Sequence, residues 1–336
     1  MEAGETSFFL NERRKIMKKL LVVFALSLFI TAPSMAIVSP SISFLSADQI
    51  MSKVLPQGKI DVSAKIEYWN PNEEYLGNTD LFMEPIANDH LTFTVLSIPL
   101  RISYGVTDNM SLRFSTQYVK YSMVETDISP SNWEGSGLGD SKIEMLYQVA
   151  KETANNPSIA VNVGADILSG VNYIELPKNA SDTSLATGTY APRYYLSGIF
   201  GKKYGVWDGM AMIGYIMQDA DRFGRDAWIP ANEIIYSVCM STTAGGGLKY
   251  GGELSGIFAG ENINDYTGLT DNTVQGRTPI TKVSVTPFVT YQQSEDISYK
   301  ACLEIPLSMR GTTSSTNMDM YRYRGINISL GVNWAI

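Results

Sequence analysis

Charged residues alternate with apolar residues along much of this 336-residue chain, and this spacing limits the chemistry that they can perform. In the segment IDVSAKIEY (residues 60–68), Asp61, Lys65 and Glu67 alternate with apolar side chains. Successive side chains of a β-strand point to opposite faces, so one face of this strand would carry charge and the other would be apolar. A charged face of this kind can line a wet, selective passage or form a network of ion pairs.

The same spacing recurs in later segments and defines a set of candidate interior residues. Asn162 belongs to it, together with ten charged residues of both signs: Arg101, Arg113, Lys142, Glu144, Asp166, Lys249, Glu253, Lys282, Lys300 and Glu304. We predict that these side chains line the inside of a barrel and set the selectivity of a narrow channel. The alternative is a barrel filled by ion pairs, which would not conduct.

Catalytic chemistry has little support in the sequence. The chain contains one histidine, His90, and a hydrolase built on Ser-His or Asp-His chemistry would have to use it. No nearby serine or carboxylate stands out at a position whose geometry relative to His90 can be predicted, and no phosphate-binding loop or Cys/His metal cluster is found in the sequence. We therefore predict no catalytic residues, no metal site and no cofactor, and interpret His90 as a loop residue.

The N-terminus has the composition of an export signal. Lys18 and Lys19 precede an apolar run over residues 20–30, and the segment Ser34-Met35-Ala36 supplies small residues for a signal peptidase, so cleavage is expected after Ala36. The run is about half of the ~20 residues that a membrane-spanning helix needs. Residues 1–16 fit no targeting pattern, so translation is expected to start at Met17. A twin-arginine signal around Arg13 is the alternative.

Two cysteines, Cys239 and Cys302, lie far apart in the sequence of a chain that is expected to be exported. One disulfide is possible there, but a disulfide framework would show more cysteines at closer spacing. We predict two free thiols.

After a polar lead-in over residues 37–58, about twelve strand-like segments follow over residues 59–336. Short turns and long loops alternate between them. The last segment, GINISLGVNWAI, keeps its alternation to Ile336, although chain termini usually fray. The terminal strand must therefore be held in a sheet, and pairing with the first strand would close a barrel.

The alternation of short and long connections distinguishes a lipid environment from a soluble core. Outer-membrane barrels have tight periplasmic turns, long extracellular loops and an even number of strands. Closure also gives every backbone N–H and C=O group a partner within the lipid. The sequence thus predicts an all-β, transmembrane antiparallel barrel of about 12 strands in the outer membrane of a Gram-negative bacterium.

Three prolines, Pro99, Pro287 and Pro306, fall inside predicted strands that a closed barrel would pair on both sides. Proline removes one donor from the hydrogen-bond ladder. We expect a bulge or a bend in the wall at each of them.

Four stretches of the chain carry a resemblance to a known family: IPLRISYGVTDNMSLRFSTQYV (98–119), GLGDSKIEMLYQV (137–149), PSIAVNVGADILSG (157–170) and GTYAPRYYLSGIFGKKYG (188–205). They resemble the outer-membrane transporters grouped under the MetA pathway of phenol degradation. The resemblance spans residues 57–217 and implies a barrel that passes aromatic or other hydrophobic compounds. It supplies no catalytic residues. The chain departs from the family pattern at Leu168 and Ser169, where Pro-Thr is usual, and at Ile336, where Phe is more common.

These observations predict a passive channel or transporter for small solutes, with hydrophobic or aromatic compounds among the candidates. Its expected partners are outer-membrane lipid, the solutes and the barrel assembly machinery. Nucleic acid is not expected, because the net charge is −8 and no basic stripe is present. The alternatives are a non-conducting structural or adhesin-type barrel that acts through its loops, and an outer-membrane hydrolase that uses His90.

Overall fold

The structure is a computed structural model, and it describes the strands and short turns of the chain. The described residues are 54–74, 84–85, 91–125, 131–167, 169, 192–218, 221–223, 226–229, 232–259, 263–266, 280–310 and 323–336. The expected export signal, most of the lead-in and His90 lie outside these residues. No helix in the described part of the chain is long and apolar enough to cross a membrane.

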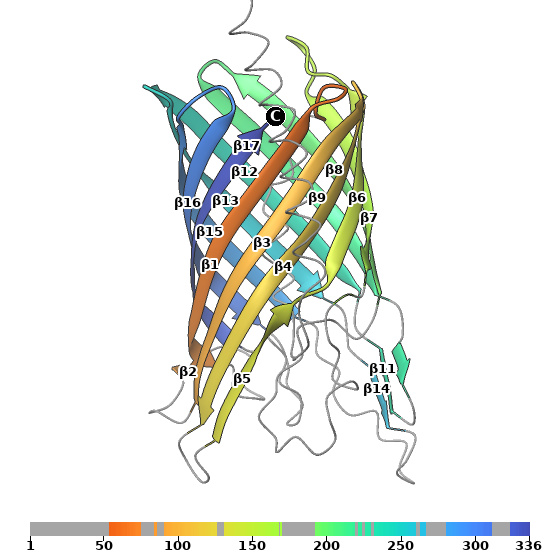
Figure 1. Cartoon of the computed structure of the whole chain (residues 1–336), viewed down its shortest axis with the longest axis vertical. Helices are drawn as coiled ribbons and strands as arrows, with labels where there is room; N and C mark the ends of the chain where they lie inside the picture. The colour runs from red at the N-terminus through yellow and green to blue at the C-terminus, as the bar shows by residue number, and fades with distance from the viewer. Residues whose placement is uncertain are drawn as a thin grey trace, which may run out of the picture.

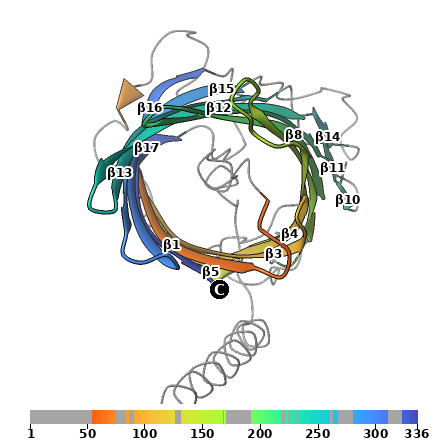
Figure 2. The ribbon, with the colours of Figure 1, turned by 90° about the horizontal axis from the view of Figure 1, so that it is seen from above.

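Twelve long antiparallel strands form a closed barrel within the described residues, as predicted (Figures 1 and 2). Hydrogen-bonded neighbours follow one another around the ring, and the last strand pairs with the first. The strands are β1 (Ile60–Glu74), β3 (Leu91–Thr107), β4 (Met110–Glu125), β6 (Ser141–Ala150), β7 (Ser158–Ile167), β8 (Arg193–Tyr204), β9 (Trp207–Gln218), β12 (Glu233–Gly245), β13 (Leu248–Ala259), β15 (Ile280–Gln292), β16 (Ile297–Arg310) and β17 (Tyr323–Ala335).

Closure explains the alternation at the end of the chain. β17 pairs with β1 from Ala335, opposite Asp61, to Tyr323, opposite Glu74. The backbone groups of Ile60 and Ile336 exchange two hydrogen bonds of 3.1 and 2.7 Å. Neither strand leaves an unpaired edge, which is the requirement for a sheet that crosses lipid.

All short connections between consecutive strands of the twelve lie at the end of the barrel where β17 ends, which we call the short-turn end (Figure 1, top). β12 and β13 meet there through Gly246 and Gly247, whose φ angles are 59° and 79°. Both central residues of this tight hairpin need a positive φ, which glycine adopts without a steric penalty. The connections of more than ten residues lie at the opposite end, which we call the long-connection end.

Five short strands complete the described structure at the long-connection end (Figure 1). β2 (Glu84–Pro85) pairs with β1, and β5 (Ser131–Leu138) pairs with the end of β4. β10 (Asp221–Phe223), β11 (Asp226–Ile229) and β14 (Ile263–Tyr266) form a separate three-stranded sheet.

The outer surface of the barrel is apolar. Leu330 is 61% exposed, whereas the adjacent Ser329 is 5% exposed because it faces the interior. Exposed aromatic side chains gather near the short-turn end, as in the interfacial belts of membrane barrels: Tyr104, Tyr147, Tyr204, Trp207, Tyr250, Tyr291 and Tyr299. This surface is suited to contact with lipid.

The three prolines interrupt the ladder in two ways. A register shift that leaves Leu307 as an extra residue lies beside Pro306, so a bulge is present there. At Pro99 and Pro287 the pairing lapses on one side without a change of register, between β1 and β3 and between β15 and β16. The ladder there loses the proline donor but keeps its alignment.

Candidate functional site in the barrel interior

The predicted interior residues lie on the inner face of the wall, and the structure divides them between its two ends. Arg101, Lys249 and Lys300 line a cavity near the short-turn end. Arg113, Lys142 and Glu253 are buried. The remaining members, Glu144, Asp166, Lys282, Glu304 and Asn162, make polar contacts with neighbouring strands; of these, Asp166, Lys282 and Glu304 lie toward the opposite end.

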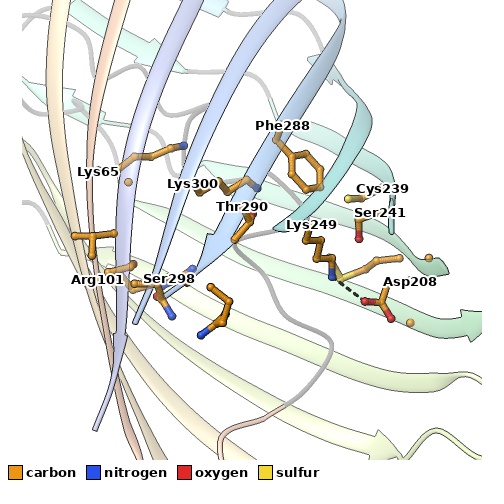
Figure 3. A pocket seen from close by; sticks show the side chains of 18 of the residues that line it. Lys65, Arg101, Asp208, Cys239, Ser241, Lys249, Phe288, Thr290, Ser298 and Lys300 are labelled. Atoms are coloured by element: carbon orange, nitrogen blue, oxygen red, sulfur yellow. Dashed lines mark hydrogen bonds and ion pairs between the residues drawn. The ribbon is translucent and has the colours of Figure 1, made fainter. Parts of the chain in front are cut away.

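The cavity has a volume of about 420 Å³ and is surrounded by positively charged side chains (Figure 3). Six lysines and arginines line it, against two carboxylates, Glu152 and Asp208. The cations are Lys65, Arg101, Lys202, Lys203, Lys249 and Lys300. They come from β1, β3, β8, β13 and β16, so basic groups approach the cavity from several sides of the ring.

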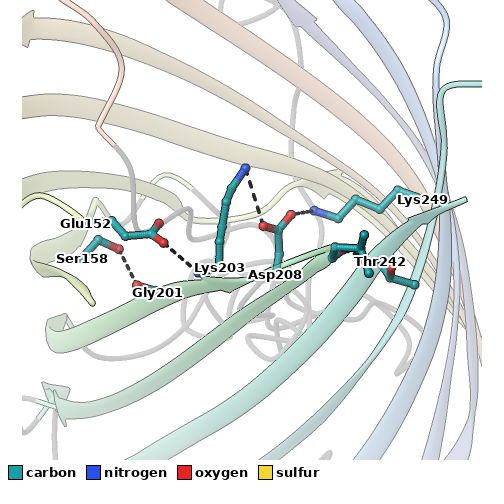
Figure 4. A network of polar contacts seen from close by, with 8 residues as sticks. Glu152, Ser158, Gly201, Lys203, Asp208, Thr242 and Lys249 are labelled. Carbon is teal, nitrogen blue, oxygen red and sulfur yellow. Dashed lines mark hydrogen bonds and ion pairs between the residues drawn. The ribbon is translucent and has the colours of Figure 1, made fainter. Parts of the chain in front are cut away.

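The two carboxylates of the cavity belong to one polar network (Figure 4). The ammonium group of Lys249 donates to Asp208 Oδ2 at 2.7 Å, and that of Lys203 lies 3.7 Å from Asp208 Oδ1. Glu152 Oε1 accepts a hydrogen bond of 2.8 Å from the backbone N–H of Lys203. Both carboxylates are therefore already engaged by groups of the cavity wall.

Apolar side chains lie beside these cations. Phe288 and Cys239 are buried and form a cluster with Met210 and Cys302. The ammonium group of Lys300 lies 4.0 Å from the centre of the Phe288 ring, within the range of a cation–π interaction. The cavity thus combines positive charge with an apolar, partly aromatic surface. Both thiols are free, as predicted.

Toward the long-connection end, cations and carboxylates are matched in pairs. Arg193 Nε donates to Asp166 Oδ2 at 2.6 Å, and the hydroxyl group of Tyr195 donates to the same carboxylate at 2.7 Å. Lys282 Nζ donates to Glu304 Oε1 at 2.7 Å. These contacts fix side chains to the wall and leave less net charge for a solute than the cavity does.

The inner wall also carries an unexpected apolar patch. A buried cluster spans the neighbouring strands β6 to β13 and consists of Leu146, Ala160, Tyr195, Ile199, Met212, Ile216, Ile235 and Ile257. β8 and β9 carry apolar residues on both faces, so apolar and polar residues alternate only weakly in their sequences. This weak alternation is the feature of the sequence that could have indicated apolar residues on the inner face.

The residues immediately before β1 contact this interior at the short-turn end. Val54 packs against the apolar cluster, and the backbone N–H of Leu55 donates to Ser111 Oγ at 2.8 Å. The N–H of Gln57 donates to Asp108 Oδ1 at 3.1 Å, in the turn between β3 and β4. The end of the lead-in thus lies across the inner wall at this end of the barrel.

Other groups of the site were missed by the sequence argument. Glu152 lies in a turn, Asp208 and Lys203 lie next to one, and Arg193 begins a strand whose alternation is weak. Alternation assigns a face only within a regular strand, so it gives no information at turns. The described residues contain no cluster of histidine, cysteine or carboxylate groups arranged to hold a metal ion.

Comparison with known proteins shows the fold. No model of a known protein family matches the chain, and no curated protein matches it in sequence. Among solved structures, the COG4313 outer membrane channel from Pseudomonas putida F1 is similar with a TM-score of 0.64. The match has 14% sequence identity and covers 89% of this chain and 100% of that one.

Two further barrels are more distant. The β domain of the Bordetella autotransporter BrkA has a TM-score of 0.45 and 9% identity, over 83% of this chain and 100% of that one. A deletion mutant of the monoaromatic hydrocarbon channel TodX has a TM-score of 0.39 and 9% identity, over 90% and 96% of the two chains. The chain has the closed twelve-stranded fold of outer-membrane barrels.

Proposed function

We propose that this protein is an outer-membrane channel for the passive passage of small solutes. The observation that carries the proposal is a closed barrel whose outer surface is apolar and whose interior holds a charged cavity of about 420 Å³. Lipid would cover the outside, because each of the twelve barrel strands has a hydrogen-bonded neighbour on both sides. Solutes would pass along the inside, where polar side chains replace water contacts.

Strand connections support one orientation in the membrane. In outer-membrane barrels the short turns face the periplasm and the long loops face outward. The cavity would then lie near the periplasmic mouth, where a solute leaves the barrel. Delivery to the membrane would use the expected signal over residues 17–36 and the barrel assembly machinery.

Hydrophobic or aromatic solutes fit the interior better than sugars do. The apolar cluster of β6 to β13 and the Phe288 ring offer surfaces on which an apolar group would lose little water. The resemblance of residues 57–217 to transporters of a phenol degradation pathway supports the same class. The charged residues of the interior would then orient solutes rather than act on them chemically.

Swelling of liposomes that contain the refolded barrel tests this function. We expect liposomes in isosmotic solutions of small monoaromatic solutes to swell faster with the folded protein than with protein denatured by heat. Equal swelling rates for folded and denatured protein would contradict a channel function.

A further inference from the structure

We infer that the cavity at the short-turn end binds an organic carboxylate that carries a small aromatic body. This inference rests on the proposed function, because the solute must enter the barrel. Its first support is charge. Six cationic and two anionic side chains line the cavity, a formal excess of four positive charges in a protein whose net charge is −8.

Nearby carboxylates reduce this excess without cancelling it. Asp208 is shared by Lys249 and Lys203, and Glu152 accepts a backbone N–H group. Lys65 pairs with Glu67 at 2.7 Å, and Glu67, which does not itself line the cavity, lowers the formal excess from four positive charges to three. A low-dielectric wall around such a charge excess strengthens the local potential and concentrates anions.

The second support is the apolar surface beside the cations. Phe288, Met210 and Cys239 contribute a contiguous apolar patch, and the ammonium group of Lys300 lies over the ring of Phe288. A benzoate-like ligand can place its carboxylate among the ammonium groups and its ring against this patch. A fully hydrated inorganic anion would gain only the first of these interactions, and a neutral aromatic compound only the second.

The third support is size. Sites for small organic ligands usually span about 300–1,000 Å³. The cavity, at about 420 Å³, lies near the lower limit and suits a single-ring compound with some bound water. Close carboxylate partners occur both at the cavity, for Lys249 and Lys65, and elsewhere in the described interior, for Arg193 and Lys282. The cavity is suited to an added anion because its lining cations outnumber its lining carboxylates.

Calorimetric titration of the folded protein in detergent micelles tests the inference without any need for transport. The probes are benzoate, its neutral analogue benzyl alcohol, its cationic analogue benzylammonium, and acetate, which lacks the ring. We expect benzoate to bind more tightly than the other three. Lys300→Gln should weaken benzoate binding about tenfold, because it removes one charge-assisted contact.

Three variants make the result specific. Lys300→Arg keeps the charge and should retain benzoate binding. Lys151→Gln removes an exposed lysine at the same end of the barrel, outside the cavity lining, and should also retain it. Phe288→Leu should lower the preference for benzoate over acetate. Migration of unheated samples on gels checks that each variant is a folded barrel.

Several results would overturn the inference. One is a benzoate affinity equal to that of benzyl alcohol, benzylammonium or acetate. The others are an unchanged benzoate affinity in Lys300→Gln and the absence of benzoate binding. Binding of benzoate by a barrel that gives no liposome swelling would support the cavity and contradict the channel. Swelling without benzoate binding would support the channel and contradict the proposed ligand of the cavity.

Discussion

At the scale of single residues, the interior combines fixed ion pairs with a cavity of excess positive charge. The Arg193–Asp166 pair is almost fully buried, with 7% and 2% of the two side chains exposed. Lys142 adds a third charged group, because its ammonium group lies 3.8 Å from the centre of the Tyr195 ring. Such pairs stabilise a barrel only as complete sets, since a buried charge without its partner is costly.

The first prediction concerns this buried pair. Asp166→Asn removes the negative charge that faces Arg193 and should lower the free energy of unfolding by roughly 3 kcal/mol. Tyr195→Phe removes only the hydroxyl donor and should cost roughly 1 kcal/mol. Urea unfolding of the refolded barrel, followed by tryptophan fluorescence, measures both. An effect of Asp166→Asn no larger than that of Tyr195→Phe would show that the pair contributes no net stabilisation.

The second prediction uses the free thiol that lines the cavity. In a Cys302→Ser background, Cys239 should react faster with an anionic methanethiosulfonate than with a cationic one, after each rate is divided by its rate with free cysteine. The reason is the excess of cationic side chains around the cavity. Mass spectrometry of the folded protein measures the two rates. A faster reaction with the cationic reagent would contradict a positive local potential.

Side-chain alternation explains which of these residues could be predicted. Arg101, Lys249 and Lys300 occupy regular strands, where each second residue faces inward. Spacing alone therefore assigns their side chains to the inner face of the wall. Glu152 and Lys203 meet only through a turn that folds back on β8. Which cations share a cavity also depends on the stagger of the twelve strands, and spacing within one strand does not reveal it.

At the scale of secondary-structure elements, the wall depends on close fits between neighbouring strands. Tyr236 of β12 lies directly opposite Gly256 of β13, and the Tyr236 ring stacks on Phe258 with 5.4 Å between centroids. A Cβ atom on Gly256 would overlap the Tyr236 hydroxyl group and lie 2.7 Å from the backbone oxygen of Lys282. The glycine thus makes room for the tyrosine on the outer face.

The third prediction tests this fit. Gly256→Ala should lower the free energy of unfolding by roughly 1–3 kcal/mol, because the added methyl group forces a shift of the tyrosine and of the adjacent strand. Gly252→Ala is the matched control: the residue lies on the same strand and face, and its added Cβ meets no atom within 4 Å. Urea unfolding of both variants in the same detergent provides the comparison. Equal stability of the two would show that the fit is not tight.

Strand prediction succeeded where the two faces of a strand differ in polarity. β1 and β17 have one apolar and one polar face, and their positions agree with the predicted segments 60–68 and 325–336. β8 and β9 also form, but their inner faces carry Ile199, Met212 and Ile216. Apolar residues on both faces remove the period of two, so the sequence identifies these strands less clearly and does not reveal the apolar inner wall.

At the scale of the whole molecule, the fold joins an apolar exterior to an interior with two different ends. Carboxylates and cations are paired toward the long-connection end, and positive charge is in excess at the short-turn end. Closure and the number of strands could be predicted, because an even set of strands with alternating short and long connections has few other solutions in lipid. The uneven distribution of charge along the barrel could not be predicted from the sequence, because it arises from the three-dimensional stagger of the strands.

Single-channel recording of the refolded barrel in a planar lipid bilayer, with a potassium chloride gradient across it, tests the central claim most directly. We predict discrete conductance steps and a reversal potential that shows a preference for chloride, because permeating ions must pass the basic cavity. A folded barrel that gives no steps would contradict the channel function. Steps with a preference for potassium would contradict the role of the cavity in selectivity.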